Sequence, residues 1–76
     1  MTALEFETAQ APKWSELEKL LTREEKQLDP GRFLELYRMC CEHLVLAQAR
    51  GFPANVIERL SVVTARAHQK IGRAHV

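Results

Sequence analysis

Apolar residues recur at helical spacing in three separate segments of the chain, and polar residues fill the positions between them. In the first segment, Pro12 is suited to the first turn of a helix because a proline has no amide hydrogen to lose there. The apolar residues that follow are spaced as on one face of a helix. The pattern therefore predicts an amphipathic helix over residues 12–27. Its apolar positions are Trp14, Leu17, Leu21 and Leu28.

The second segment is the most apolar, and it has both a start and a stop signal. The Asp29 carboxylate can accept hydrogen bonds from the first amides of a helix that begins at Pro30. Gly51 can adopt the left-handed conformation that ends helices, and Phe52 follows where a hydrophobic contact is common. We expect a helix over residues 30–49 that contacts neighbours on two sides. Its apolar stripe consists of Phe33, Tyr37, Cys40, Leu44 and Ala47, widened by Leu34, Leu36, Cys41 and Val45.

The third segment begins at Pro53 and separates cleanly into an apolar and a polar side. The positions predicted to be buried are Val56, Ile57, Leu60, Val63 and Ala67. The charged positions expected to face water are Glu58, Arg59, Arg66 and Lys70.

Short connections between the segments predict that consecutive helices run antiparallel. The expected fold class is all-α: an antiparallel three-helix up-down-up arrangement, with the second helix in the middle and a short N-terminal extension. The first ten residues, which include Leu4 and Phe6, are expected to be either a frayed extension or a short helix laid over one end of the bundle.

The composition describes a chain that folds but has little room for a catalytic pocket. The protein has 76 residues, of which 46% are hydrophobic and 28% charged. A chain of this length buries roughly 60–65% of the surface that its unfolded form exposes, which allows only a modest core. The sequence shows no Ser-His-Asp arrangement and no glycine-rich phosphate loop. We therefore predict no enzymatic activity, no cofactor and no small-molecule substrate.

Charge is spread unevenly along the chain although the formal net charge is only +1. Residues 1–28 carry six acidic and four basic side chains, residues 29–49 three acidic and two basic, and residues 50–76 one acidic and five basic. The basic last third contains Phe52 but no interleaved aromatic residues for base stacking, and it lacks helix-turn-helix spacing. Specific binding of nucleic acid is not expected.

The two cysteines, Cys40 and Cys41, are neighbours in the sequence. Adjacent cysteines do not staple distant loops, which excludes a disulfide scaffold. The first residues lack the basic start and apolar run of a secretory signal, and no stretch approaches the roughly 18 apolar residues of a membrane span. The residues as written therefore predict a soluble, intracellular chain.

A zinc site is a weaker alternative for part of the second helix. Cys40 and His43 share a helical face, and His68 could complete a site if the third helix ran alongside. However, the chain has no Cys-x-x-Cys pair, and buried cysteines commonly pack as small hydrophobic residues. We therefore expect core packing for Cys40 and Cys41, and no metal site.

Trp14, Tyr37 and Arg38 are candidate structural or interface residues in the first two helices. Trp14 is expected to anchor the core at the mouth of the bundle, although an exposed tryptophan would mark a partner site. Tyr37 and Arg38 flank the apolar stripe. Arg38 could pair with Glu35 and Glu42 of its own helix. We favour a bridge from Arg38 to an acidic residue of the first helix, which would set the register of the two helices.

Arg66 and His68 are the candidate interface residues of the third helix. His68 is expected to hydrogen-bond an acidic side chain of a neighbouring helix. The alternative is a position near a membrane surface, where Arg66 and Lys70 would meet lipid phosphates.

The last six residues, 71–76, break the helical pattern, because Gly72 interrupts it and no apolar contact follows. This hexapeptide looks like the translation of a widely used sequencing-adapter oligonucleotide. The expected organisation is therefore an N-terminal helical domain of a larger protein over residues 1–70 and a non-native tail over residues 71–76.

Each helical segment carries a short motif, and the three occur together at defined separations. The motifs are the string from Trp14 to Leu21, the set Leu36-Tyr37-Arg38 with Cys41, Leu44 and Ala47-Gln48-Ala49-Arg50, and Leu60 with Arg66-Ala67-His68. Together they resemble the N-terminal cytoplasmic region of the stage II sporulation protein M family, a group of bacterial integral membrane proteins. The resemblance covers most of residues 6–70.

The resemblance implies that several transmembrane helices follow the Arg66-Ala67-His68 helix, and that this domain lies on the cytoplasmic side of the cytoplasmic membrane. The basic segment over residues 50–70 agrees with the positive-inside rule. The implied partners are the protein's own transmembrane domain or other membrane proteins, with an anionic-lipid contact through the basic C-terminal helix. The predicted function is a non-enzymatic packing or docking module. The alternative is a self-contained soluble helical protein–protein interaction module.

Overall fold

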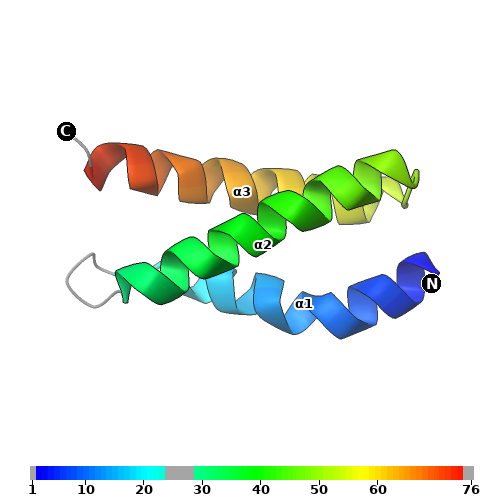
Figure 1. The fold of residues 1–76 in the computed structure, drawn as a ribbon, viewed down its shortest axis with the longest axis horizontal. Coiled ribbons are helices and arrows are strands. Elements are labelled where there is room, and N and C mark those ends of the chain that lie inside the picture. The colour runs from blue at the N-terminus through cyan, green and yellow to red at the C-terminus, as the bar shows by residue number, and fades with distance from the viewer. Residues whose placement is uncertain (1, 24–28, 75–76) are drawn as a thin grey trace.

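The protein is an antiparallel three-helix bundle, as the sequence pattern predicts (Figure 1). The computed structural model describes residues 2–23 and 29–74. Helix α1 spans Ala3–Leu20, α2 spans Pro30–Ala49 and α3 spans Ala54–Ala74. Each helix packs against both of the others. The arrangement is therefore triangular in section, and α2 does not separate α1 from α3.

Helix α1 begins at Ala3, so the expected start at Pro12 is wrong. The Thr2 hydroxyl accepts a hydrogen bond from the Glu5 amide at 3.1 Å, and the Glu5 carboxylate accepts one from the Thr2 amide at 3.2 Å. This capping box and the burial of Phe6 oppose the roughly 3 kcal/mol that an interior proline costs a helix. Residues 3–10 are consequently part of α1, and not a frayed or separate piece.

Helix α1 also ends earlier than predicted, at Leu20. The chain then turns tightly, with the Thr22 amide bonded to the Lys19 carbonyl and the Arg23 amide bonded to the Leu20 carbonyl. Residues 24–27 of the predicted helix, and Leu28 of its apolar stripe, lie outside the described residues.

The predicted bounds of α2 are confirmed. Asp29 Oδ1 accepts hydrogen bonds from the Gly31 and Arg32 amides at 3.0 and 3.3 Å. At the other end, the Phe52 amide donates to the Ala47 carbonyl at 3.0 Å and the Gly51 amide donates to the Gln48 carbonyl at 3.3 Å. These two bonds form a Schellman motif, which satisfies carbonyl groups at the end of the helix.

The Schellman motif depends on the backbone conformation of Gly51, whose φ is +64°. Replacing Gly51 with alanine is expected to lower the free energy of unfolding by about 1–2 kcal/mol, because a side chain makes the left-handed conformation costly. An added Cβ would meet nothing within 4 Å, so the loss would come from backbone strain alone. Urea unfolding followed by circular dichroism checks this value. A variant as stable as the natural chain would contradict it.

The core is built from one stripe of each helix. Its buried members are Phe6, Trp14, Leu17 and Leu20 of α1, Phe33, Leu36, Cys40 and Ala47 of α2, and Val56, Leu60, Val63 and Ala67 of α3. The predicted stripe of α3 is therefore confirmed, except that Ile57 is only half-buried. The predicted stripe of α2 was too wide, because Leu34 and Val45 are exposed and Tyr37 and Leu44 are half-buried.

Helix α3 continues through Gly72 to Ala74, so the expected interruption at Gly72 is wrong. An interior glycine costs a helix only about 1 kcal/mol relative to alanine. Ile71, directly before it, packs against the core. The packing of Ile71 favours continuation of the helix beyond residue 70.

Candidate interaction site

Trp14 is a fully buried core residue at the centre of a polar and aromatic cluster. Its indole Nε1 donates a hydrogen bond to His43 Nδ1 at 2.9 Å. The Phe6 ring lies 5.8 Å from the indole, and the guanidinium carbon of Arg59 lies 5.5 Å from the centre of the Trp14 ring. Trp14 therefore packs as the expected core anchor, inside the bundle and not at its mouth, and it offers no exposed surface to a partner.

His43 is the polar partner of this cluster, and the sequence pattern did not assign it that role. Burial lowers the pKa of His43, the positive charge of Lys13 lowers it further, and Glu42 opposes the change. Since Nδ1 accepts the indole hydrogen, neutral His43 must carry its own hydrogen on Nε2. Protonation of His43 would add a hydrogen to Nδ1, which would then face the indole N–H of Trp14. The geometry and the lowered pKa thus favour the same neutral form.

The neutral form of His43 predicts a pH-dependent stability. Between the lowered folded pKa and the ordinary value of 6.5, the unfolded chain binds a proton that the folded chain does not. The contribution of His43 to the free energy of unfolding is therefore expected to be constant above about pH 7.5 and to fall as the pH falls below about 6.5. Urea titrations followed by the fluorescence of Trp14 measure this dependence.

His43→Asn is the matched variant for that measurement, because the asparagine Oδ1 is bonded to Cγ as Nδ1 is, so it can still accept the indole hydrogen but does not titrate in this range. We expect the variant to lose most of the slope between about pH 5.5 and 7. A natural chain whose stability does not change over that interval would contradict the assignment.

Two arginine–glutamate pairs tie α1 to the other helices. Arg32 of α2 binds Glu16 through Nε at 2.7 Å and Nη2 at 2.8 Å. Arg59 of α3 binds Glu18 at 2.9 and 3.1 Å. These bidentate contacts are directional, so they help to fix how far each helix is shifted along α1. The expectation that Arg59 faces water is therefore wrong.

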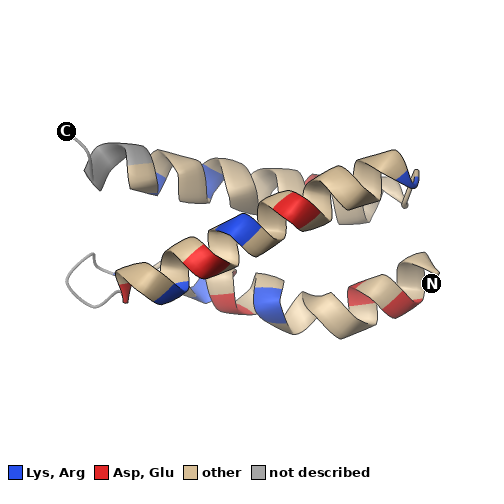
Figure 2. Cartoon of the chain, in the orientation of Figure 1, with Lys and Arg blue, Asp and Glu red and all other residues tan. Residues whose placement is uncertain are grey.

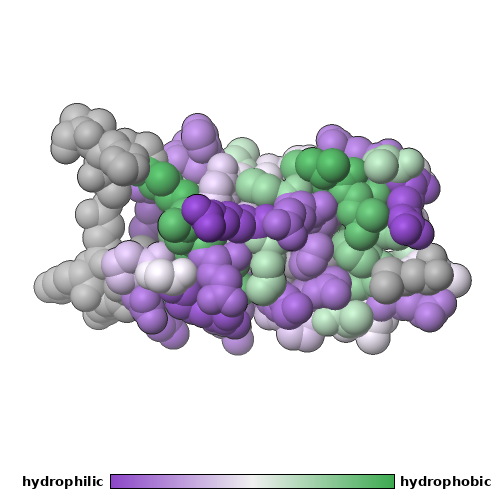
Figure 3. Space-filling view, viewed as in Figure 1, coloured by the Kyte–Doolittle hydropathy of each residue, from purple (hydrophilic) through white to green (hydrophobic). Residues whose placement is uncertain are grey.

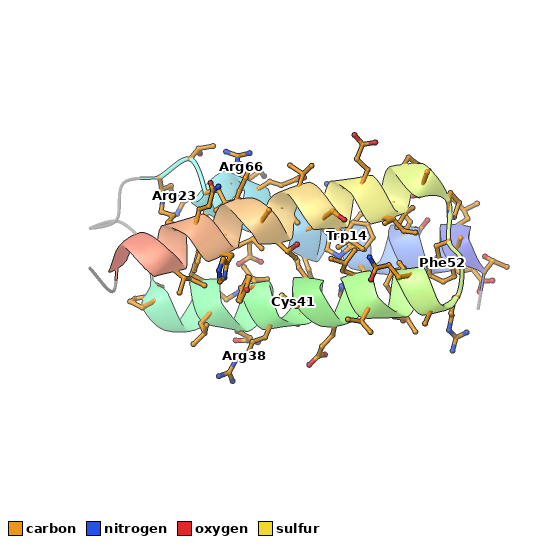
Figure 4. All side chains as sticks on the ribbon, turned by 90° about the horizontal axis from the view of Figure 1, so that it is seen from above. Trp14, Arg23, Arg38, Cys41, Phe52 and Arg66 are labelled. Atoms are coloured by element: carbon orange, nitrogen blue, oxygen red, sulfur yellow. The ribbon has the colours of Figure 1, made fainter. Side chains whose placement is uncertain are left out.

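Arg38 does not form the bridge to α1 that the sequence suggested. It is exposed, and its side chain points away from the other two helices (Figure 4). Arg32 occupies the side of α2 that meets Glu16, so it takes the role expected for Arg38. The rotation of α2 about its axis, which the sequence pattern left open, decides between the two arginines.

Tyr37 and His68 meet across the seam between α2 and α3. The Tyr37 hydroxyl lies 3.4 Å from His68 Nδ1, and the two rings stack with centroids 6.5 Å apart. The expected acidic partner of His68 is therefore replaced by Tyr37. Burial raises the pKa of Tyr37, and neighbouring Cys41 contributes in the same direction.

The three residues considered for zinc are held apart in separate environments. Cys40 is fully buried, and burial with nearby Cys41 raises the pKa of its thiol to about 11. His43 is engaged by Trp14, and His68 by Tyr37. Within the described residues, no three metal-ligating side chains come together. Core packing is confirmed for Cys40, whereas Cys41 is half-exposed.

An exposed surface that carries two large apolar side chains runs along α2 on the side away from the core. We call it the outer stripe. Val45 is 65% exposed and Leu34 is 41% exposed, and both belong to this stripe. Figure 3 shows two hydrophobic areas on this side of the molecule with hydrophilic surface between them. The outer stripe consists of Gly31, Leu34, Arg38, Cys41, Val45 and Gln48.

A second distinctive surface is a basic cluster where α1 and α3 end. Lys70 Nζ donates to the Arg23 carbonyl at 2.8 Å and to the Leu21 carbonyl at 3.4 Å, which corrects the expectation that it only faces water. Arg66 lies one turn before Lys70 and is exposed. The Arg23 and Arg66 side chains lie on the same side of the bundle (Figure 4). Figure 2 shows basic residues in the C-terminal half of α3, before the grey end of the helix.

A family model matches residues 4–73, which is nearly the whole chain. The chain belongs to the family described as "Domain of unknown function (DUF8413)". No curated protein and no solved structure matches it. The family match makes no connection with the stage II sporulation protein M family, so that resemblance stays a hypothesis. Among the described residues, no helix is long and apolar enough to cross a membrane.

Proposed function

We propose that this domain is a non-enzymatic docking module that binds a helix of another polypeptide along the outer stripe of α2. The single observation that carries the proposal is the exposure of large apolar side chains, Leu34 and Val45, at a spacing typical of helix–helix seams. Positions 31, 34, 38, 41, 45 and 48 alternate steps of three and four residues. That alternation keeps a stripe on one side of a helix over several turns.

The environments of the polar groups support a binding role over a catalytic one. His43 and Arg59 are committed to Trp14 and Glu18, and Arg32 is committed to Glu16. These side chains hold the helices in register, and the outer stripe of α2 takes no part in their contacts. A binding surface on helices that already hold one another loses little entropy when a partner helix binds.

Photo-crosslinking in the cells that naturally produce the protein tests this proposal. A photoreactive amino acid is placed at Val45, and in a control variant at Val62, which is 52% exposed but lies on α3. We expect a discrete adduct from position 45 only. Mass spectrometry would identify it, and the purified components would reproduce it. No adduct from position 45, or equal adducts from both positions, would contradict the proposal.

Attachment to a membrane protein is a second candidate, and the basic cluster favours it. In this candidate the domain is the cytoplasmic head of a stage II sporulation protein M-like protein on the cytoplasmic side of the membrane. Arg23, Arg66 and Lys70 lie where α3 approaches its C-terminal end. Basic side chains at such a position attract anionic lipid headgroups. The motif resemblance points the same way.

Two measurements test the membrane candidate. The chain should bind vesicles of phosphatidylglycerol and phosphatidylcholine but not of phosphatidylcholine alone, and Arg66→Gln or added salt should weaken that binding. Arg50→Gln, in the connection between α2 and α3 at the opposite end of the bundle, is the matched control. The genomic reading frame should continue from residue 70 into several apolar spans. Lipid binding that Arg66→Gln leaves unchanged, or a frame that stops without such spans, would contradict this candidate.

A further inference from the structure

The outer stripe combines one protruding apolar side chain with one hollow. Val45 is 65% exposed near the C-terminal end of α2. Toward the other end of the helix, an open hollow of about 270 Å³ lies on the same side of α2. Its lining residues are Gly31, Leu34, Glu35, Arg38, Met39 and Glu42.

The lining of the hollow has the arrangement of a coiled-coil hole. In helix pairs of that kind, a side chain of one helix enters the space between four residues of the facing helix. Positions 31, 34, 35 and 38 surround such a space, since they lie three, four and seven residues from the first. Gly31 contributes no side chain, which keeps this part of the hollow open. A branched aliphatic residue such as valine would fit there.

We propose that the outer stripe binds the outer stripe of a second copy of this chain, with the two α2 helices antiparallel. This inference rests on the proposed function as a docking module, and it names the partner. A two-fold axis makes every contact reciprocal. We place Val45 of each copy in the other copy's hollow, between Leu34 and Glu35. The two-fold axis then lies midway between these positions along α2, at the level of residues 39 and 40.

The charges of the stripe agree with this same register. Residues 38 and 42 lie about equally far on either side of the axis, so Arg38 of each copy faces Glu42 of the other. Within the described part of the chain, Arg38 takes part in no ion pair. A parallel pair would instead place Arg38 against Arg38. Shape and charge therefore select one antiparallel register independently.

The expected dimer is weak. Helix α2 has 20 residues and is about 30 Å long, so two such helices bury less surface than a standard protein–protein interface. We expect a dissociation constant on the order of micromolar or higher.

Analytical ultracentrifugation of the full chain between about 1 and 500 µM tests the second-copy inference. The natural chain should shift from monomer to dimer over this range. Val45→Lys should stay monomeric, whereas the control Val62→Lys should dimerise like the natural chain. Circular dichroism establishes that each variant is folded. A natural chain that is monomeric throughout, or a dimer that Val45→Lys leaves intact, would overturn the inference.

A charge exchange tests the register itself. Arg38→Glu and Glu42→Arg should each weaken the dimer by about tenfold or more, because like charges then face each other. The double variant should recover the natural affinity to within about threefold, since it restores both pairs with reversed charges. A double variant no stronger than the single ones would overturn the antiparallel register.

These outcomes separate the inference from the proposed function. A monomeric chain that still forms a Val45 adduct with a different protein would discard the second copy and keep the docking module. An adduct of the chain with itself would support the second copy. A monomeric chain without any Val45 adduct would discard both.

Discussion

Replacing Trp14 with alanine is expected to lower the free energy of unfolding by about 3–5 kcal/mol. The indole is fully buried, contacts Phe6 and Arg59, and donates a hydrogen bond to His43. Its removal would leave a cavity and an unpaired histidine nitrogen. A domain of 76 residues has a total stability of roughly 4–11 kcal/mol, so this variant would be close to unfolding at room temperature. Urea unfolding followed by circular dichroism at low protein concentration measures the loss.

Trp14→Phe is the matched control, because it keeps a buried aromatic ring but removes the indole N–H. We expect it to lose less, about 1–3 kcal/mol, mainly from the unpaired Nδ1 of His43. Trp14→Phe should also change the pH dependence assigned to His43. Without the indole N–H, a hydrogen on Nδ1 of protonated His43 would no longer face another donor. A Trp14→Ala variant within about 1 kcal/mol of the natural chain would show that Trp14 does not anchor the core.

Replacing Leu60 with alanine is expected to cost about 2–5 kcal/mol. Leu60 is fully buried in the middle of the α3 stripe. It belongs to the core cluster, to which all three helices contribute. Alanine favours helix formation, so the loss would come from packing and not from the helix itself. The fluorescence of Trp14 during urea unfolding provides the measurement, with circular dichroism as a second probe.

Val62→Ala is the control for Leu60→Ala, because the two residues lie on the same helix and Val62 is 52% exposed. We expect its stability to stay within about 0.5 kcal/mol of the natural chain. Equal losses at the two positions would contradict the described orientation of α3.

The bounds of α2 could be predicted from the sequence because local chemistry defines both ends. Asp29 and Gly51 act on amides and carbonyls within a few residues of themselves, and the structure shows those hydrogen bonds. The start of α1 was predicted wrongly because Pro12 was given the role of a first-turn residue. The capping box formed by Thr2 and Glu5 was present in the sequence, and it would have indicated the correct start.

The inter-helix partners of the polar residues could not be predicted in the same way. Arg32 and Arg38 are both long basic residues of α2, and only the rotation of the helix decides which one meets Glu16. The bond between Trp14 and His43 likewise joins residues 29 positions apart. Such contacts depend on where three helices come to rest against one another, which helical periodicity does not specify.

The sequence by itself determined the number of helices, their antiparallel order and the buried stripe of α3 apart from Ile57, because these follow from local spacing, capping and short connections. Only the tertiary structure decided that Arg59 covers Trp14, that Lys70 binds the carbonyls after α1, and that Leu34 and Val45 stay uncovered. The physical reason is that three packed helices can cover only part of the apolar surface of α2. Packing geometry selects which part that is, and it leaves the outer stripe exposed.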